Sequence, residues 1–305
     1  MPSRPGIGLI LSFWLATTAF VGYRDVWPRF FSDAPPAVRI DLADEAAQAL
    51  PARWTVFRGT DHIGSLTTRM EYTPADDTFR FHNTFTQLSF DLDLAKIRIE
   101  CPRLETNVRV NRAGELREQS LSGEMKLFLG VKPLAVELGH AAAKVTGVVR
   151  DGTLVGDCEI FYPANATVPT ITRALEPVPV PGGQVLNPMT PVGRLRDIQP
   201  GRRWVIRVVD PLRDAVYVMT RDVVKQSELA AGALGSRPES QELIAEVLST
   251  PERLERKLSD PVDCWVIEYR GEGVEARTWV NVADGRVMRQ EASGFGEKLR
   301  FERED

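Results

Sequence analysis

The chain has 305 residues, of which 43% are hydrophobic and 26% are charged, and its net charge is only -4. This length and composition allow one large domain or two smaller ones with a buried core, and they argue against a mainly disordered chain. The near-neutral balance provides no global field for nucleic acid, which disfavours helicase, histone-like and polymerase functions.

The segment from residue 6 to residue 22, GIGLILSFWLATTAFVG, carries no charge. Its length is close to the lower limit for a helix that crosses a bilayer. A cleaved signal peptide is the rival interpretation, with Thr17 and Ala19 as small residues before a cut. We favour an uncleaved anchor because the apolar run continues to Gly22 and because Trp14 is unusual in a signal core.

Aromatic and basic residues follow this segment and resemble an interfacial belt: Tyr23, Arg24, Trp27, Arg29, Phe30 and Phe31. We therefore predict that residues 1–31 form a single-pass anchor in the inner membrane, in contact with membrane lipid. The flanking charges leave the orientation open. We place the body in the periplasm because most of the chain follows a signal-like start.

Residues 32–52 are predicted to be a spacer, extended at Pro35 and Pro36, with a short helix in DLADEAAQAL at 41–50. From Trp54 to residue 162 apolar and polar residues alternate in several runs, which indicates β-strands. Residues 53–162 are therefore expected to form an antiparallel β meander.

Three glycines recur between these strand-like runs. Gly114, Gly152 and Gly285 each follow a small or acidic residue and precede an apolar residue by two positions. Glycine adopts positive φ without a steric cost, so such pairs are typical of hairpin turns. In TWVNVADGRVMRQEAS, residues 278–293, this turn reading replaces an acid-base site. We expect Gly285→Val to reduce stability before it reduces any activity.

Residues 163–200 contain eight prolines and are predicted to be a surface crossover or a linker rather than a central strand or helix. Residues 201–305 are expected to form a second β part. Within it, residues 225–259 are rich in Ala, Leu, Glu and Lys and predict two or three short helices or a mobile insertion.

Candidate acid and base residues are sparse. Asp91 and Asp93 would share one strand face as a metal or acid pair, but their alternation with Phe90 and Leu92 also fits a solvated face. His62 and His82 lack a nucleophile placed by sequence. No HxH or HExxH motif occurs, so neither a metal nor a cofactor is expected.

The three cysteines, Cys101, Cys158 and Cys264, contain no CxxC pair, which disfavours a zinc knuckle or a thioredoxin-type site. One disulfide with a spare thiol and three reduced cysteines both remain open.

Tryptophans and arginines are the candidate ligand-binding residues. The tryptophans lie near strand starts and would either line a ligand cavity or fill the core. The arginines suit anionic groups, although interleaved aspartates also predict ordinary surface ion pairs. The candidates are Trp54, Trp204, Trp265, Trp279, Arg194, Arg196 and Arg203.

Two motifs resemble the periplasmic lipoprotein-carrier type of sheet: Trp54-Thr-Val-Phe-Arg with Ile63-Gly64, and Thr278-Trp279-Val280-Asn281 through Gly285, Val287, Arg289 and Glu291. Trp27-Pro28-Arg29 and Gly201, Trp204 and Asp210-Pro211-Leu212 also resemble segments of uncharacterised anchored envelope proteins. The resemblance implies a half-barrel, in which an antiparallel sheet curls around helices. A shuttling carrier is soluble, however, whereas this chain is predicted to be tethered.

The sequence therefore predicts a mainly β (α+β) protein, built from curved antiparallel meander sheets or a half-barrel with a few short helices, after one N-terminal transmembrane helix. The leading hypothesis is a tethered envelope protein that binds a lipid-like or apolar ligand in the sheet concavity. The alternative is a non-catalytic structural or adaptor subunit that docks an envelope protein partner. An enzyme ranks third because no catalytic set can be assembled.

Overall fold

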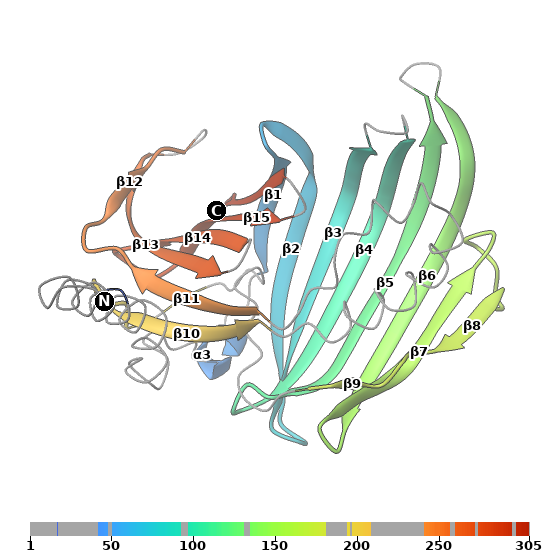
Figure 1. The fold of residues 1–305 in the computed structure, drawn as a ribbon, viewed down its shortest axis with the longest axis horizontal. Helices are drawn as coiled ribbons and strands as arrows, with labels where there is room; N and C mark the ends of the chain where they lie inside the picture. Colours follow the sequence, from blue (N-terminus) through green and yellow to red (C-terminus); the bar gives the residue numbers. More distant parts are fainter. Residues whose placement is uncertain are drawn as a thin grey trace, which may run out of the picture.

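In a computed structural model, the described part of the chain is mainly β and forms one antiparallel sheet of 16 strands that does not close into a barrel (Figure 1). The mainly β prediction is therefore confirmed. The structure describes residues 17, 42–47, 51–92, 97–130, 135–180, 194–195, 197–208, 241–256, 260–271, 274–294 and 297–304.

The first half of the chain supplies a short helix and nine strands. They are α3 (Leu42–Ala47), β1 (Ala52–Arg58), β2 (Asp61–Thr73), β3 (Thr78–Leu92), β4 (Ile97–Asn111), β5 (Leu116–Leu129), β6 (Val136–Arg150), β7 (Thr153–Phe161), β8 (Ile171–Ala174) and β9 (Val178–Pro179). The helix lies inside the expected spacer, and β1–β7 follow the predicted meander.

The second half supplies seven strands: β10 (Arg203–Val208), β11 (Gln241–Val247), β12 (Glu252–Leu254), β13 (Val262–Gly271), β14 (Val274–Asn281), β15 (Val287–Gly294) and β16 (Glu297–Arg303). The main strand order is β10-β11-β13-β14-β15-β16-β1-β2-β3-β4-β5-β6-β7-β8. Because β1 pairs with both β16 and β2, the first strand joins the two halves into one sheet.

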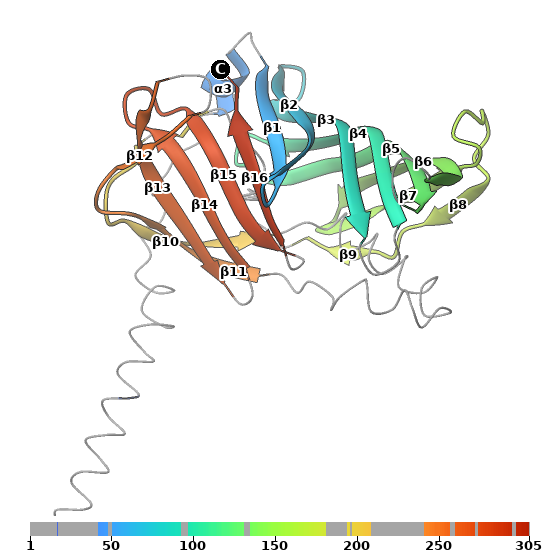
Figure 2. The ribbon, with the colours of Figure 1, turned by 90° about the horizontal axis from the view of Figure 1, so that it is seen from above.

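The sheet has a longer part and a shorter part, which differ in the length of their strands. Strands β2–β6 are 13 to 15 residues long, whereas β10, β11 and β13–β16 have 6 to 10 residues. Figure 2 shows the two parts set at an angle, with β1 and β16 at the junction. Seen from above, the sheet is therefore bent rather than flat.

One face of the sheet is apolar, and we call it the inner face. Trp54 and Leu66 of β1 and β2 are fully buried and share a core cluster with Trp204 and Leu243 of β10 and β11. These strand pairs are well separated in the sheet order. Their packing therefore shows that the shorter part of the sheet curves around the inner face.

The three predicted glycine turns are confirmed. Gly114, Gly152 and Gly285 have φ values of 81°, 73° and 72° and lie in the β4–β5, β6–β7 and β14–β15 hairpins. At Gly285 a Cβ atom would lie 2.6 Å from the carbonyl oxygen of Leu195, so this turn also leaves no room for a side chain. The turn chemistry was thus readable from the sequence.

The helical interpretation of residues 225–259 is wrong for its described part. Residues 241–247 form β11 and residues 252–254 form β12. The physical reason is period-two burial: Leu243, Ala245 and Val247 all point into the core, and this decides the conformation over helix propensity. Residues 225–240 and 257–259 lie outside the described residues.

The proline-rich region 163–200 connects opposite edges of the sheet, because β8 ends one edge and β10 begins the other. It contains two short strands, β8 and β9, which both pair with β7. The prediction of a crossover without a central strand therefore fits the described residues. The predicted anchor at 1–31 lies outside them apart from Thr17, and within the described part no helix is long and apolar enough to span a bilayer.

Candidate functional site

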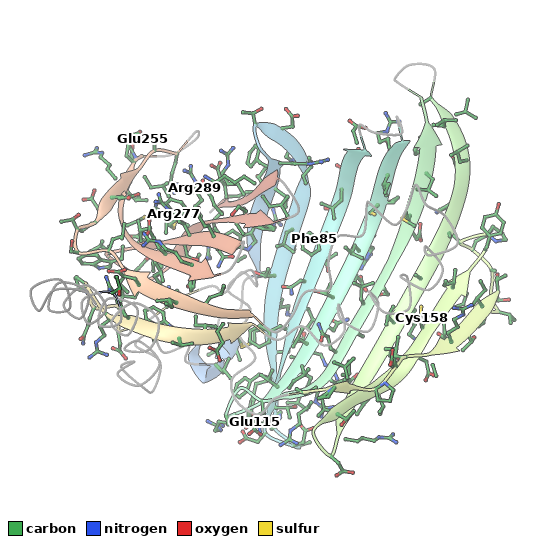
Figure 3. All side chains as sticks on the ribbon, in the orientation of Figure 1. Phe85, Glu115, Cys158, Glu255, Arg277 and Arg289 are labelled. Atoms are coloured by element: carbon green, nitrogen blue, oxygen red, sulfur yellow. The ribbon has the colours of Figure 1, made fainter. Side chains whose placement is uncertain are left out.

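The inner face of β3–β7 carries no charged side chain at the positions that the strand register pairs on it. One row across five strands illustrates this pattern: Phe85, Leu104, Gly123, Ala143 and Ile160 lie directly opposite one another in turn. Figure 3 labels Phe85 and Cys158 on this part of the sheet. A surface of this composition suits hydrocarbon rather than ions.

One end of this inner face is covered. Helix α3 packs through Leu42 against Phe79, Phe81 and Val110, near the β2–β3 and β4–β5 turns. The chain that follows β8 covers the neighbouring strands in the same way. Its residues Leu175 and Val178 cluster with Leu116, Val145, Leu154 and Cys158. The sheet interior is therefore filled at this end.

The other end of the face stays accessible, and we call this surface the open apolar face. Met125 and Leu129 are 40% and 46% exposed, and the remaining large side chains are half-buried. By register the side chains of this surface all point to the inner face. The open apolar face consists of Ile99, Cys101, Leu104, Met125, Leu127, Leu129, Gly139, Ala141 and Ala143.

Small residues on β6 form the floor of the open apolar face. Gly139, Ala141 and Ala143 follow one another on the inner side of this strand. The Leu104 side chain lies against Gly123, and the Tyr162 ring lies 3.8 Å from where a Cβ of Gly139 would be. Larger side chains thus flank a shallow strip of residues with no more than a methyl group. An alkyl chain can approach the backbone closely along such a strip.

Two pairs of polar groups on the inner face bond to each other. The Trp54 indole N–H donates to the Thr68 hydroxyl at 3.2 Å, and the Asn83 amide donates to the Thr106 hydroxyl at 3.2 Å. These bonds satisfy groups that would otherwise be costly to bury. The inner face is therefore apolar without leaving these four groups unsatisfied.

The outer face of the longer part is polar. His82 Nδ1 lies 2.5 Å from Asn107 Oδ1, and the Asn107 amide donates to the Ser120 hydroxyl at 3.3 Å. His82 Nε2 also lies 3.3 Å from a Glu71 oxygen. Ser120 is thus bonded to an amide rather than to the imidazole. His82, Asn107 and Ser120 border a cavity of about 290 Å³. They do not form a nucleophile-base pair, because the serine hydroxyl is not bonded to the imidazole.

The outer face of the shorter part carries a ladder of alternating charge. Glu268, Arg277, Glu291 and Arg300 lie opposite one another on β13–β16. The Glu268 carboxylate is only 6% exposed and contacts both Arg270 and Arg277. A cavity of about 450 Å³ borders this ladder. Because each buried acid has cationic neighbours, the ladder reads as structural pairing.

Of the two alternatives for the tryptophans, the structure shows core filling for three of the four. Trp54 and Trp204 are buried in the core of the shorter part, and Trp265 packs against the same core. Trp279 lies on the opposite face, where it clusters with Cys264 and its indole N–H donates to Glu252 at 3.1 Å. Strand curvature closes the inner face around the first three, so they fill a core instead of lining an open concavity.

Two of the three predicted arginines lie within the described structure. Arg203 is exposed on the outer face and pairs with Glu246 at 2.8 Å. Arg194 forms an isolated bridge with Arg286, beside the segment where Leu195 caps the core. Arg196 lies outside the described residues. The mixed-charge interpretation holds for Arg203.

The remaining candidates also have structural explanations. His62 is exposed, and its ring lies edge-on to Phe57 with centroids 5.9 Å apart. Asp91 is exposed on the outer face opposite Arg98, while Asp93 lies outside the described residues. Among the described side chains, no group of three potential ligands could hold a metal ion.

All three cysteines are free thiols, so the open question of pairing resolves against a disulfide. Burial raises the pKa of the Cys101 and Cys158 thiols and raises that of Cys264 to about 12. None of them is therefore a reactive thiolate at neutral pH. Cys101 differs in position, because it lies on the open apolar face.

Sequence reasoning missed the open apolar face itself. Its signals were present in KLFLG, residues 126–130, and in LGHAAAK, residues 138–144, where apolar or small residues alternate. Alternation alone does not say whether a face will be covered.

A scan against protein-family models found no match for this chain, and searches of curated proteins and of solved structures found none either.

Proposed function

We propose that this protein binds a lipid-like or apolar ligand on the open apolar face, within a curved, half-barrel-like sheet. The observation that carries the proposal is the difference between the two ends of one uncharged surface. Where α3 and residues 175–180 lie, the apolar side chains are covered; beyond them, Leu127, Leu129 and Met125 remain accessible. An apolar surface of this kind marks an interaction site.

The chemistry of the face favours hydrocarbon chains. It offers no charged side chain at the paired positions, and its floor on β6 is made of Gly139, Ala141 and Ala143. A lipid acyl chain gains dispersion contacts and loses contact with water on such a floor. The resemblance to lipoprotein-carrier sheets supports the same ligand class.

The proposal includes an anchor and a location. The uncharged run at 6–22 would hold the chain in the inner membrane, with the sheet in the periplasm. In this arrangement the protein is tethered rather than shuttling. Membrane lipid is then both the surface to which the chain is attached and the source of the ligand.

A substitution pair on β6 tests the site. Ala141→Phe fills the floor from the inner side, whereas Ala142→Phe adds the same ring on the outer side, because Ala141 lies opposite Met125 and Ala142 opposite Glu124. Native mass spectrometry of the full-length protein, gently extracted from membranes, should show co-purified lipid on the wild type and on Ala142→Phe. The amount of lipid that co-purifies with Ala141→Phe should be at least about tenfold lower than with the wild type.

The main rival is an adaptor subunit that docks an envelope protein. It predicts a stoichiometric polypeptide and no lipid in the same spectra, and that result would overturn lipid binding. Cys101 gives an independent readout at alkaline pH, where a larger share of its thiol ionises, since a bound lipid should slow its reaction with a maleimide. Equal rates with and without added lipid would contradict occupancy of the open apolar face.

A further inference from the structure

Exposed hydrophobic side chains gather at one corner of the sheet. Of the ten large hydrophobic residues that are exposed in the described structure, seven lie at the β5–β6 strand ends and the β7–β8 turn. Val136 and Leu138 are 64% and 54% exposed. We call this set the apolar rim: Met125, Leu129, Val136, Leu138, Tyr162, Val168 and Ile171.

The apolar rim is continuous with the open apolar face. Leu129 and Val136 lie directly opposite each other on β5 and β6 and point to the inner face. Tyr162 lies beside Gly139, on the floor of the same face. A hydrocarbon chain that leaves the floor of β6 would therefore meet Leu129, Val136 and Tyr162 on its way to this corner.

The strand ends project beyond their neighbour. Pairing between β6 and β7 begins at Ala142 and Phe161, so within the described residues no strand pairs with 136–141 on that side. A register shift between Leu127 and Phe128 leaves Leu138 as an extra residue in β6. Such a bulge, together with the charged Glu137, is a device that blocks strand addition. The corner is thus poorly suited to an added peptide strand.

A bilayer fits these observations better. The rim side chains come from three strand ends and a turn, and a lipid phase can receive them whatever the direction of their backbone. Aliphatic side chains with one tyrosine are also the composition of interfacial segments. We propose that the apolar rim docks on a lipid bilayer and is the place where lipid enters and leaves the open apolar face.

The proposal rests on the function proposed above for the source of its ligand, but docking itself can be measured separately. Nearby charges are mixed: Lys126, Glu137 and the His140–Glu124 contact at 3.4 Å lie beside the rim. Attraction to anionic lipid therefore contributes little, and burial of apolar side chains drives docking. Binding should persist at high salt, where attraction between exposed charges is screened.

Hydrogen exchange of the full-length protein in nanodiscs tests the docking. Addition of vesicles of equimolar phosphatidylethanolamine and phosphatidylglycerol should slow exchange in residues 125–130, 135–141 and 162–171. Strand β12, which lies in the other part of the sheet, should not change. Protection that is absent from the rim, or confined to the outer-face ladder, would overturn the proposal.

Substitutions separate the rim from the anchor. The triple variant Leu129→Asn, Val136→Asn and Leu138→Asn should bind vesicles at least about tenfold more weakly, because three exposed apolar groups no longer leave water. The control, Val148→Asn with Val282→Asn, changes exposed hydrophobic side chains elsewhere and should bind as the wild type does. The single variant Leu138→Asp repeats the test at a side chain that is 54% exposed, so the change is expected to leave the core intact.

The outcomes distinguish the two proposals. If the wild type docks but carries no lipid in native mass spectra, lipid binding on the open apolar face fails and rim docking stands. If lipid is carried and both Leu138→Asp and the triple variant dock as well as the wild type, rim docking fails and lipid binding stands. Capture of a polypeptide at the rim, without protection by vesicles, would replace the bilayer with a protein partner.

Discussion

Gly285→Ala should destabilise the protein more than the same change at Gly152, although both glycines have nearly the same backbone conformation. Their φ values are 72° and 73°, and both lie in hairpin turns. An alanine in this left-handed region costs about 1–2 kcal/mol at either position. The two glycines also make matching hydrogen bonds. The Gly285 carbonyl oxygen accepts the Leu195 N–H at 2.9 Å, and the Gly152 carbonyl oxygen accepts the Val180 N–H at 2.8 Å.

The difference lies in the space around the new methyl group. At Gly152 no atom lies within 4 Å of the added Cβ, whereas at Gly285 the Leu195 carbonyl oxygen would be 2.6 Å away. The segment that carries Leu195 must therefore move. Loss of the hydrogen bond from Leu195 would lower the unfolding free energy by about 1 kcal/mol more. Removal of the Leu195 side chain from the core would lower it by about 2 kcal/mol more.

The assay is urea denaturation followed by tryptophan fluorescence, which reports the buried Trp54 and Trp204 of the same core. We expect Gly285→Ala to lose about 1–3 kcal/mol more unfolding free energy than Gly152→Ala. Gly285→Val should lose still more, because a β-branched residue is poorly tolerated at positive φ. Equal losses for the two alanine variants would refute the packing of Leu195 against this turn.

Three further results are expected. Trp54→Phe should cost about 1–2 kcal/mol of unfolding free energy in the same urea assay, because the Thr68 hydroxyl loses its indole donor; no change would contradict that bond. Arg112 lowers the pKa of Asp77 to about 2, so this carboxylate stabilises the fold above its unfolded pKa of about 4 and loses that contribution as pH falls toward 2. An NMR titration midpoint near 4 for Asp77 would refute the pairing. Cys264 should resist iodoacetamide at mildly alkaline pH until the protein unfolds, because burial raises its pKa to about 12; rapid native alkylation would refute its burial.

Local patterns predicted the strands and turns because these depend on nearby residues. Alternating side chains between residues 53 and 162 gave β1–β7, and Gly114, Gly152 and Gly285 gave their hairpins. At QELIAEV, residues 241–247, the helix-favouring composition predicts a helix although the side chains alternate as in a strand. Its alternation of Leu243, Ala245 and Val247 was the better signal, since the neighbouring strands bury that face.

The site was harder to predict because coverage of a face depends on distant segments. The tryptophans at 54, 204 and 265 lie on the expected face, but the sheet curves so that residues from β10 and β11 meet β1 and β2 over it. Nothing in the spacing along the chain reports that curvature. The open apolar face, in contrast, is built from small and aliphatic residues that carry no distinctive motif.

The two parts of the sheet solve the same problem in different ways. Each has one mostly apolar side that is costly to leave in water. In the shorter part, curvature brings Trp204 and Leu243 against Trp54 and Leu66, so the side closes on itself. Among the described residues, α3 and residues 175–180 cover one end of the longer part. The uncovered remainder, with Leu127 and Leu129, is therefore the place where a ligand adds most to stability, and lipid binding should raise the unfolding free energy of the longer part.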